Sequence, residues 1–262
     1  MLRKLLKYDL KNMYKFLSVF YILSILFSIT TRVLFSLKQT VIINVLGQIS
    51  VGCMFAMIAN IIINTIMRNW IRFNETLYKD ESYLTHTLPV KKETLYTSKF
   101  LLSMINLLTS FIVILITIFI AYYTKERFDL LKYIINDISS NYNISWSLFL
   151  MSLIIVLFLE LYQTIQSGFL GIIIGNKKNN NKTLYSVVFG LVTYFLSQMV
   201  VLLSLFIFGI FNKDVMNIFI SNQISNSILK MLIILSICVY LLIIFIEKFI
   251  AKKLLKQGVN VD

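Results

Sequence analysis

The stretch TLYSVVFGLVTYFLSQMVVLLSLFIFGIFN, residues 183–212, identifies the class to which this protein belongs. It contains no Asp, Glu, Lys or Arg. A helix needs about 20 predominantly apolar residues to cross the hydrocarbon core of a bilayer, and few helices of water-soluble proteins stay free of charge for so long. The stretch therefore predicts a transmembrane helix.

Five further apolar runs accompany this one. Residues 39–67 and 100–124 are likewise free of charged side chains. Hydrophobic residues make up 58% of the 262 positions and charged residues 14%, and the polar segments are each too short to form a core of their own. We therefore expect one all-α, polytopic membrane domain over residues 1–262. Its six transmembrane helices are expected near residues 16–37, 42–67, 100–122, 146–174, 184–211 and 228–246.

The basic residues predict how these spans are oriented. Lys and Arg number 25, against 12 Asp and Glu. Of the 25, 18 fall in the N-terminal tail, in the loops after the second and fourth spans, and in the C-terminal tail. Because cytoplasmic loops carry the excess of Lys and Arg, both termini and these two loops are expected in the cytoplasm, with the spans in the cell membrane. The same distribution favours contact with anionic membrane lipids and argues against a nucleic-acid partner.

Two segments outside the spans have the periodicity of amphipathic helices. In residues 1–15, apolar side chains recur at helical spacing while most basic ones fall elsewhere around the helix. We interpret this tail as an interfacial helix on the inner leaflet, with a simple membrane-insertion signal as the alternative. A second interfacial helix is expected between the third and fourth spans from four apolar residues on one side: Phe128, Leu131, Ile135 and Ile138.

Residues 68–99, between the second and third spans, are too apolar for a solvated linker. Pro89, the only proline of the chain, requires an extended or turned backbone before it. A helix that begins at Thr94 or in the preceding turn would then run into the third span. We expect a compact cytoplasmic hairpin that docks a partner; the alternative is that its apolar side chains lie on the inner membrane surface. Those side chains are Phe73, Tyr78, Tyr83, Leu84 and Leu88.

Within this segment, residues 80–90 read DESYLTHTLPV. With Lys99 a short distance on, the stretch resembles the cytoplasmic-loop signature D-E-G-Y-L-T-x-T-L-P-V of bacterial ATP-binding-cassette (ABC) transporter permeases of the type-2 export class. The resemblance covers about residues 73–99, and the rest of the chain agrees in span count and topology. Ser82 replaces the usual glycine, and a serine does not share the freedom of glycine at positive φ. His86 replaces the usual apolar residue.

This resemblance implies a permease subunit that pairs with a second permease copy or a homologous permease, and with a separate cytoplasmic ABC ATPase. The N-terminal helix would then be the elbow helix of that family. ATP and Mg would be held by the ATPase, so this chain is expected to bind no cofactor. The residues expected to contact the ATPase are Tyr78, Asp80, Glu81, Tyr83, Leu84, Leu88 and Pro89.

A polar patch is expected inside the fourth span. Glu160 lies near the middle of this span, where an ionised carboxylate costs on the order of 2.5–3.5 kcal/mol, and Gln163 and Ser167 follow on about the same side. The patch could line a translocation path or a permease dimer interface; alternatively, Glu160 is protonated and hydrogen-bonded between helices. Farther along, the spacing of Gly171 and Gly175 allows close helix approach.

The sequence contains no recognisable catalytic or metal-binding pattern. Residues 175–183 lack the second glycine of a phosphate-binding loop, and His86, the only histidine, is expected at the surface. Cys53 and Cys238 lie in apolar runs and are interpreted as packing residues. We expect no enzymatic activity in this chain. The alternative function is that of a non-transporting membrane sensor or immunity subunit, which would bind a peptide at the outer face through residues 122–145.

Overall fold

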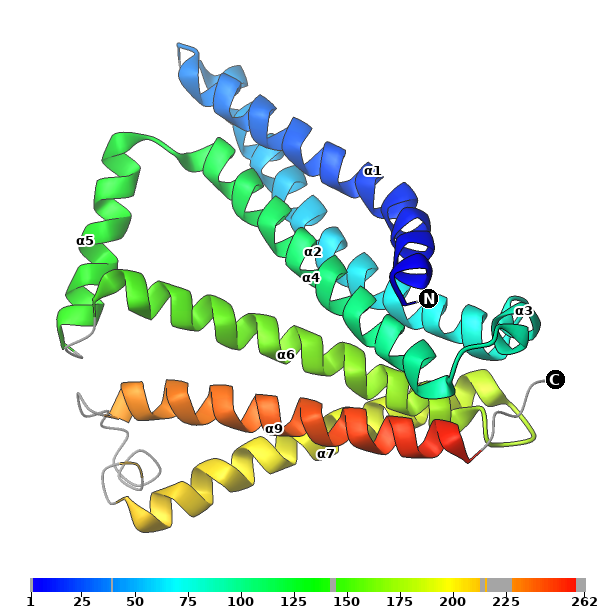
Figure 1. Cartoon of the computed structure of the whole chain (residues 1–262). Coiled ribbons are helices and arrows are strands. Elements are labelled where there is room, and N and C mark those ends of the chain that lie inside the picture. Colours follow the sequence, from blue (N-terminus) through cyan, green and yellow to red (C-terminus); the bar gives the residue numbers. More distant parts are fainter. Residues whose placement is uncertain (1, 39, 142–144, 213–214, 216–227, 258–262) are drawn as a thin grey trace. The chain divides into compact units, whose positions relative to one another are not determined.

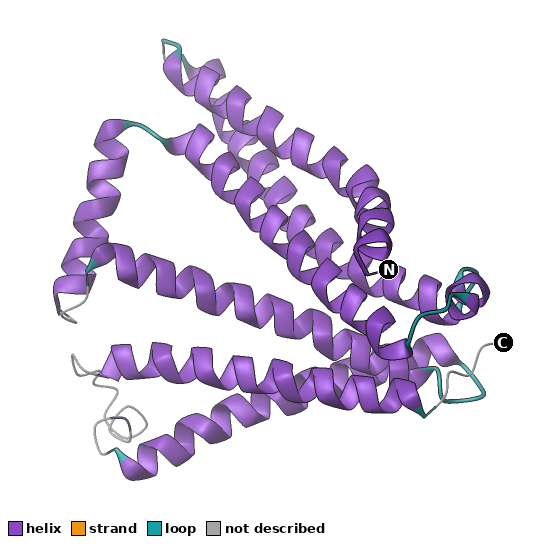
Figure 2. Ribbon diagram, in the orientation of Figure 1, coloured by secondary structure: helices purple, strands orange, loops and turns teal. Residues whose placement is uncertain are grey.

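The computed structural model describes residues 2–38, 40–141, 145–212, 215 and 228–257. No strand occurs among these residues, and helices account for nearly all of them (Figure 2). In chain order (Figure 1), the helices are α1 (Leu2–Ser36), α2 (Val41–Tyr78), α3 (Ser82–Thr87), α4 (Lys92–Tyr122), α5 (Lys125–Asn141), α6 (Trp146–Gly175), α7 (Lys182–Phe211) and α9 (Ile228–Lys256).

Six of these helices are long and apolar enough to cross a membrane: α1, α2, α4, α6, α7 and α9. This confirms the predicted all-α, multi-pass architecture with six spans. Each predicted span lies within one of the six helices except at its very ends, because the apolar runs without charge leave the backbone no partner in lipid other than its own helical hydrogen bonds.

The helices extend well beyond the predicted spans in three places. Helix α2 continues to Tyr78 and α4 begins at Lys92, so the predicted loop over residues 68–99 shrinks to a connection over residues 79–91. The sequence pattern missed this extension because the buried stripe at the end of α2 is partly polar. Its members recur at helical spacing and are Asn69, Arg72, Phe73, Thr76 and Leu77.

The N-terminal segment differs from the prediction in being continuous with the first span. Residues 2–36 form the single helix α1, which contains neither glycine nor proline to interrupt it. Its buried residues lie in both halves of the helix: Asp9, Met13 and Leu17, and then Ser24, Ser28 and Thr31. The expected second helix outside the spans is present as α5, and α9 extends beyond the predicted end of the sixth span to Lys256.

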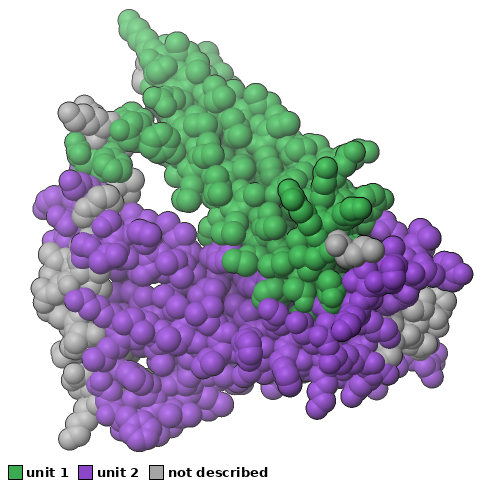
Figure 3. Space-filling view, viewed as in Figure 1, with its two compact units in different colours: residues 1–72, 94–129 green, residues 73–93, 130–262 purple. Residues whose placement is uncertain are grey.

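The chain divides into two compact units, which Figure 3 distinguishes by colour: residues 1–72 with 94–129, and residues 73–93 with 130–262. Hydroxyl groups join the three long helices of the first unit. Ser110 Oγ on α4 lies 2.8 Å from the Tyr21 hydroxyl of α1 and 2.7 Å from Thr65 Oγ1 of α2. Such contacts between helices replace the hydrophobic driving force that lipid does not supply.

In the second unit, α6 packs against α7 and α9. Gly171 and Gly175 of α6 face the backbone of α7 so closely that a Cβ atom at either position would overlap with it, at Gly190 and Ser186 respectively. The predicted close approach at these two glycines is therefore confirmed, and α7 is the helix that approaches.

Replacing Gly171 by alanine is expected to destabilise the second unit by roughly 1–3 kcal/mol, because the backbone of α7 must move away from the new methyl group. The measurement is the unfolding transition of the purified chain in detergent. Gly52→Ala on α2 is the control, since no atom of a neighbouring helix lies within 4 Å of a Cβ built there. That control should be neutral or stabilising by up to about 1 kcal/mol, from the better helix propensity of alanine. A Gly171→Ala variant as stable as Gly52→Ala would contradict the observed packing.

Candidate functional site

The segment over residues 73–93 forms a compact helical hairpin, which we call the 73–93 hairpin. It consists of the end of α2, the short helix α3, an extended connection and the first residues of α4. Leu88, before Pro89, has φ −64° and ψ 139°, so the backbone is extended where the proline requires it. The helix that leads into the third span begins at Lys92, close to the predicted start.

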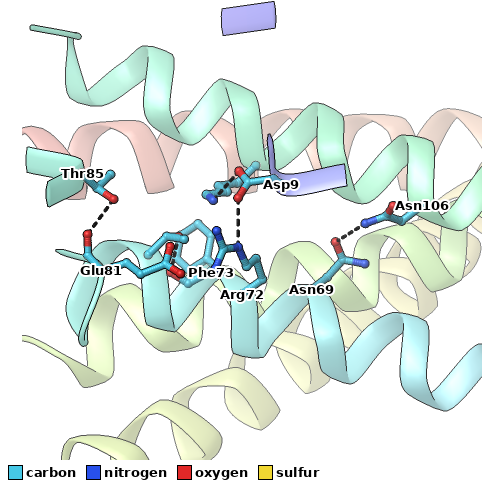
Figure 4. Close-up of polar contacts among 9 residues, drawn as sticks. Asp9, Asn69, Arg72, Phe73, Glu81, Thr85 and Asn106 are labelled. Atoms are coloured by element: carbon cyan, nitrogen blue, oxygen red, sulfur yellow. Dashed lines mark hydrogen bonds and ion pairs between the residues drawn. The ribbon is translucent and has the colours of Figure 1, made fainter. Parts of the chain in front are cut away.

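Hydrogen bonds hold α3 against the end of α2. The Ser82 amide donates to the Lys79 carbonyl at 2.7 Å, and the His86 imidazole Nε2 lies 3.1 Å from the Leu77 carbonyl oxygen. On α3 itself, the Thr85 hydroxyl donates to the Glu81 carbonyl at 2.8 Å (Figure 4). The ring of His86, expected at the surface, is thus partly buried and fixes the hairpin.

The serine at position 82 fits its turn. Among the described residues, Asn181 is the only one other than glycine with a positive φ. Ser82 therefore does not need the left-handed conformation that favours glycine. It is buried as the first residue of α3. The departure from the family signature at this position is compatible with the turn that the chain forms.

The residues predicted to contact a partner divide into exposed and buried members. Tyr83 and Leu84 on α3 are 76% and 69% exposed. Leu88, Asp80 and Pro89 are also exposed, and Glu81 is partly exposed. Tyr78, in contrast, is only 8% exposed. The surface that the hairpin offers is therefore formed by Asp80, Tyr83, Leu84, Leu88 and Pro89, with Glu81 at its edge, and we call it the α3 surface.

Contacts between described residues attach the hairpin to the long helices of its own unit. The rings of Phe73 and Phe169 on α6 are stacked, with centroids 4.2 Å apart and an interplanar angle of 15°. The side-chain amide of Asn176, which follows α6, donates to Asn74 Oδ1 at 3.3 Å. At the other end of the hairpin, Glu93 forms an ion pair with Lys256 of α9. The hairpin is thus connected to both α6 and α9.

A buried charged cluster lies in the first unit, where α1, α2 and α4 meet. Asp9 Oδ1 accepts a hydrogen bond from Arg72 Nε at 2.9 Å, and Asp9 Oδ2 accepts one from Lys99 Nζ at 2.6 Å. Figure 4 shows the Asp9–Arg72 pair and, farther along α2, the contact between Asn69 and Asn106. All three charged side chains are buried. We call this group the Asp9 cluster; it ties the N-terminal part of α1 to the helices on either side of the hairpin.

The periodicity of residues 1–15 that predicts an amphipathic helix consists of apolar side chains and does not include Asp9. The sequence pattern therefore did not identify Asp9 as a buried residue. Asp9 precedes Met13 and Leu17 by one and two helical turns and belongs to the same buried stripe. A single acidic residue in a strongly basic tail is the signal that could have identified it.

The polar patch predicted on α6 faces α7 and α9. Gln163 and Ser167 are fully buried, whereas Glu160 is only partly buried. The Ser167 hydroxyl donates to Glu247 Oε1 of α9 at 2.7 Å, and the Gln163 amide Nε2 reaches the same oxygen at 3.2 Å. The Ser197 hydroxyl of α7 lies 3.1 Å from this oxygen and 2.9 Å from the Thr193 carbonyl, and shares its hydrogen between them. These four residues, Gln163, Ser167, Ser197 and Glu247, form the Glu247 cluster.

Glu247 follows the predicted end of the sixth span directly, and its side chain is nevertheless buried. The side chain is buried because α9 continues past it, with Ala251 and Leu255 buried one and two turns farther on. The recurrence of small and apolar residues after Glu247 was the available signal.

Within the part of the chain that the structure describes, no group of three or more His, Cys, Asp or Glu side chains could hold a metal ion. The two cysteines are free, with Cys238 exposed and Cys53 partly exposed. The predicted outer recognition segment, residues 122–145, includes residues 142–144, which lie outside the described residues. Comparison of the chain with protein-family models, with curated proteins and with solved structures finds no match.

Proposed function

We propose that this protein is the membrane-spanning permease subunit of an ATP-driven ABC exporter, and that the α3 surface binds the ATPase. The observation that carries the proposal is the exposure of Tyr83 and Leu84 on a short helix between two long apolar helices. Exposed aromatic and aliphatic side chains on a rigid, hydrogen-bonded element are typical of the anchors of protein interfaces. The sequence of this same element, residues 80–90, resembles the cytoplasmic-loop signature of these permeases.

The charge distribution supports a cytoplasmic position for the hairpin. The two tails and the segments after the second and fourth predicted spans carry most of the Lys and Arg residues, 18 of 25. By the positive-inside rule these segments, the hairpin among them, face the cytoplasm, with the spans in the cell membrane, so that an ATPase can reach the α3 surface.

The contacts of the hairpin supply a path for coupling. A displacement of α3 acts on α6 through the Phe73–Phe169 stack and on α9 through the Glu93–Lys256 pair. The hairpin also contains the last residues of α2 and the first residues of α4, so a displacement of α3 acts on these two helices as well. A movement driven by the ATPase is thereby passed to helices long enough to span the membrane, and the coupling is mechanical.

In this proposal the partners supply the ATP chemistry and the rest of the translocation path. ATP and Mg are bound by the cytoplasmic ATPase, and a second permease copy or a homologous permease completes the translocation path. Lipids surround the apolar faces of the six helices, of which α7 is the most exposed. No role of this chain in ATP chemistry is proposed.

Labelling from either side of the membrane tests the position of the hairpin. In a background with Cys53 and Cys238 replaced by serine, a cysteine at Leu84 should react with a membrane-impermeant maleimide only after the cells are opened. A cysteine at Tyr133, an exposed residue of α5, is the control and should react in intact cells. Reaction of the Leu84 cysteine in intact cells would place the α3 surface out of reach of ATP and end the proposal.

Reconstitution separates transport from sensing. The chain, purified together with its ATPase and inserted into proteoliposomes, should hydrolyse ATP and accumulate a hydrophobic peptide or lipid probe in an ATP-dependent way. A non-transporting sensor would move no probe, whatever it binds at its outer face.

A further inference from the structure

The hydrogen bonds of the Glu247 cluster are unevenly distributed over its carboxyl group. Ser167, Ser197 and Gln163 each place a donor group within hydrogen-bond distance of Oε1, and the single hydroxyl hydrogen of Ser197 is shared with the Thr193 carbonyl, 2.9 Å away. Oε2 of the same carboxyl is buried and has no hydrogen-bond partner among the described residues. Oε1 thus has three neighbouring donor groups, whereas Oε2 is a buried acceptor that the described residues do not satisfy.

A second oxygen in the cluster is also buried and unsatisfied. Oε1 of the Gln163 side chain is buried and has no hydrogen-bond partner among the described residues, although Nε2 of the same amide contacts both Ser167 and Glu247. The side chains of Gln163 and Glu247 are each at least nine-tenths buried. Two unsatisfied oxygens, on α6 and on α9, therefore belong to groups that are already in contact.

The described residues provide no cation for this carboxyl group. Glu247 forms no ion pair among them, in contrast to Asp9, which has both Arg72 and Lys99. A buried carboxylate without a countercharge is strongly disfavoured inside a membrane protein. The surrounding oxygens are those of hydroxyl, amide and carboxyl groups, the kinds that bind hard cations and protons. A single carboxylate is balanced by a single positive charge.

We propose that the Glu247 cluster is a binding site for one monovalent cation, a proton or an alkali metal ion, held between α6, α7 and α9. The bound cation neutralises Glu247 and satisfies its second oxygen. Because the ligands come from three helices, occupancy of the site stabilises their packing. This site is separate from the α3 surface and does not depend on the ATPase.

Few other titratable groups approach the cluster. On α6, Glu160 lies one turn before Gln163 and is partly buried. On α9, Tyr240 lies near the side chain of Gln198, which follows Ser197 on α7. Lys248 is next to Glu247 in the sequence and partly exposed, and Tyr194 is one turn before Gln198. Glu160 is the only other carboxyl group on the described parts of these three helices, which makes it the natural control.

The test uses the purified full-length chain in detergent, with Glu247→Gln and Glu160→Gln as matched variants. If the cation is a proton, the infrared spectrum at neutral pH contains the C=O stretch of a protonated carboxyl group. This band disappears in Glu247→Gln, remains in Glu160→Gln and is lost on titration with base. If the cation is an alkali ion, this band is missing, and Na⁺ or K⁺ raises the unfolding temperature relative to N-methylglucamine at equal ionic strength. That rise in unfolding temperature disappears in Glu247→Gln and remains in Glu160→Gln.

Ser197→Ala keeps the test decisive if Glu247→Gln does not fold, since it removes one hydrogen bond and little volume. It should move the carboxyl band to higher frequency, or raise the alkali-ion concentration at half-effect by about 10-fold. The proposal is overturned if the wild-type chain shows neither signal, if Glu160→Gln removes the signal instead, or if both Glu247→Gln and Ser197→Ala leave it unchanged.

Discussion

Replacing Asp9 by alanine is expected to cost about 3–5 kcal/mol of unfolding free energy. Asp9 is the shared acceptor of Arg72 and Lys99, at 2.9 and 2.6 Å, and both cations are buried. Without the carboxylate, two positive charges remain close together in an interior of low dielectric constant, and their repulsion adds to the lost hydrogen bonds. The measurement is a denaturant titration of the purified chain in mixed micelles, followed by the helical circular dichroism signal.

Two further variants distinguish an electrostatic effect from a general loss of structure. Asp129→Ala on α5 removes an exposed carboxylate and should change the stability by no more than about 0.5 kcal/mol. The double variant Asp9→Ala with Lys99→Met should be destabilised by less than the sum of the single variants, by about 0.5–3 kcal/mol, because one of the two cations is gone. Additive costs, or an Asp9→Ala variant as stable as Asp129→Ala, would show that the buried charges do not hold α1 in place.

The second large effect is expected on partner binding. Replacing both Tyr83 and Leu84 by alanine should weaken the complex with the ATPase by roughly 100-fold or more, since each well-packed anchor residue contributes about 2 kcal/mol or more. The unfolding transition should not change, because these side chains are 76% and 69% exposed and hold nothing within the chain. The measurement is the affinity of the purified variant for the ATPase that co-purifies with the wild-type chain, recorded together with the ATP hydrolysis of the complex.

Helix α5 offers a matched control for this double substitution. Leu130 and Tyr133 are 60% and 73% exposed, and their replacement by alanine removes the same two side-chain types at another surface. This control should bind the ATPase like the wild type. Equal weakening by both double variants would indicate a nonspecific loss of apolar surface, and failure of any ATPase to co-purify with the wild-type chain would count against the proposed function as a whole.

The six spans were predictable because membrane insertion depends mainly on long apolar runs without charge, which the sequence displays directly. The backbone at Pro89 was predictable for a similarly local reason, since a proline restricts the residue before it. The close approach at Gly171 and Gly175 also follows from residue type, although only the structure identifies α7 as the neighbour.

The two buried polar clusters were not predictable in the same way. Asp9, Arg72 and Lys99 are far apart in the sequence, and each alone is typical of a solvated face. Their burial results from mutual neutralisation, which depends on how three helices meet. Gln163 and Ser167 were predicted as a polar patch, but Glu247, the group on which both converge, could not be paired with them without knowledge of how α9 packs against α6.

Helix α2 is longer than a membrane crossing requires. Its 38 residues extend about 57 Å at 1.5 Å per residue, whereas the hydrocarbon core of a bilayer is about 30 Å thick. The excess ends at Tyr78, where the hairpin begins, and no proline or glycine interrupts the helix after Gly52. The excess of about 27 Å corresponds to about five helical turns, which project from the bilayer at the hairpin or are taken up by a tilt of α2.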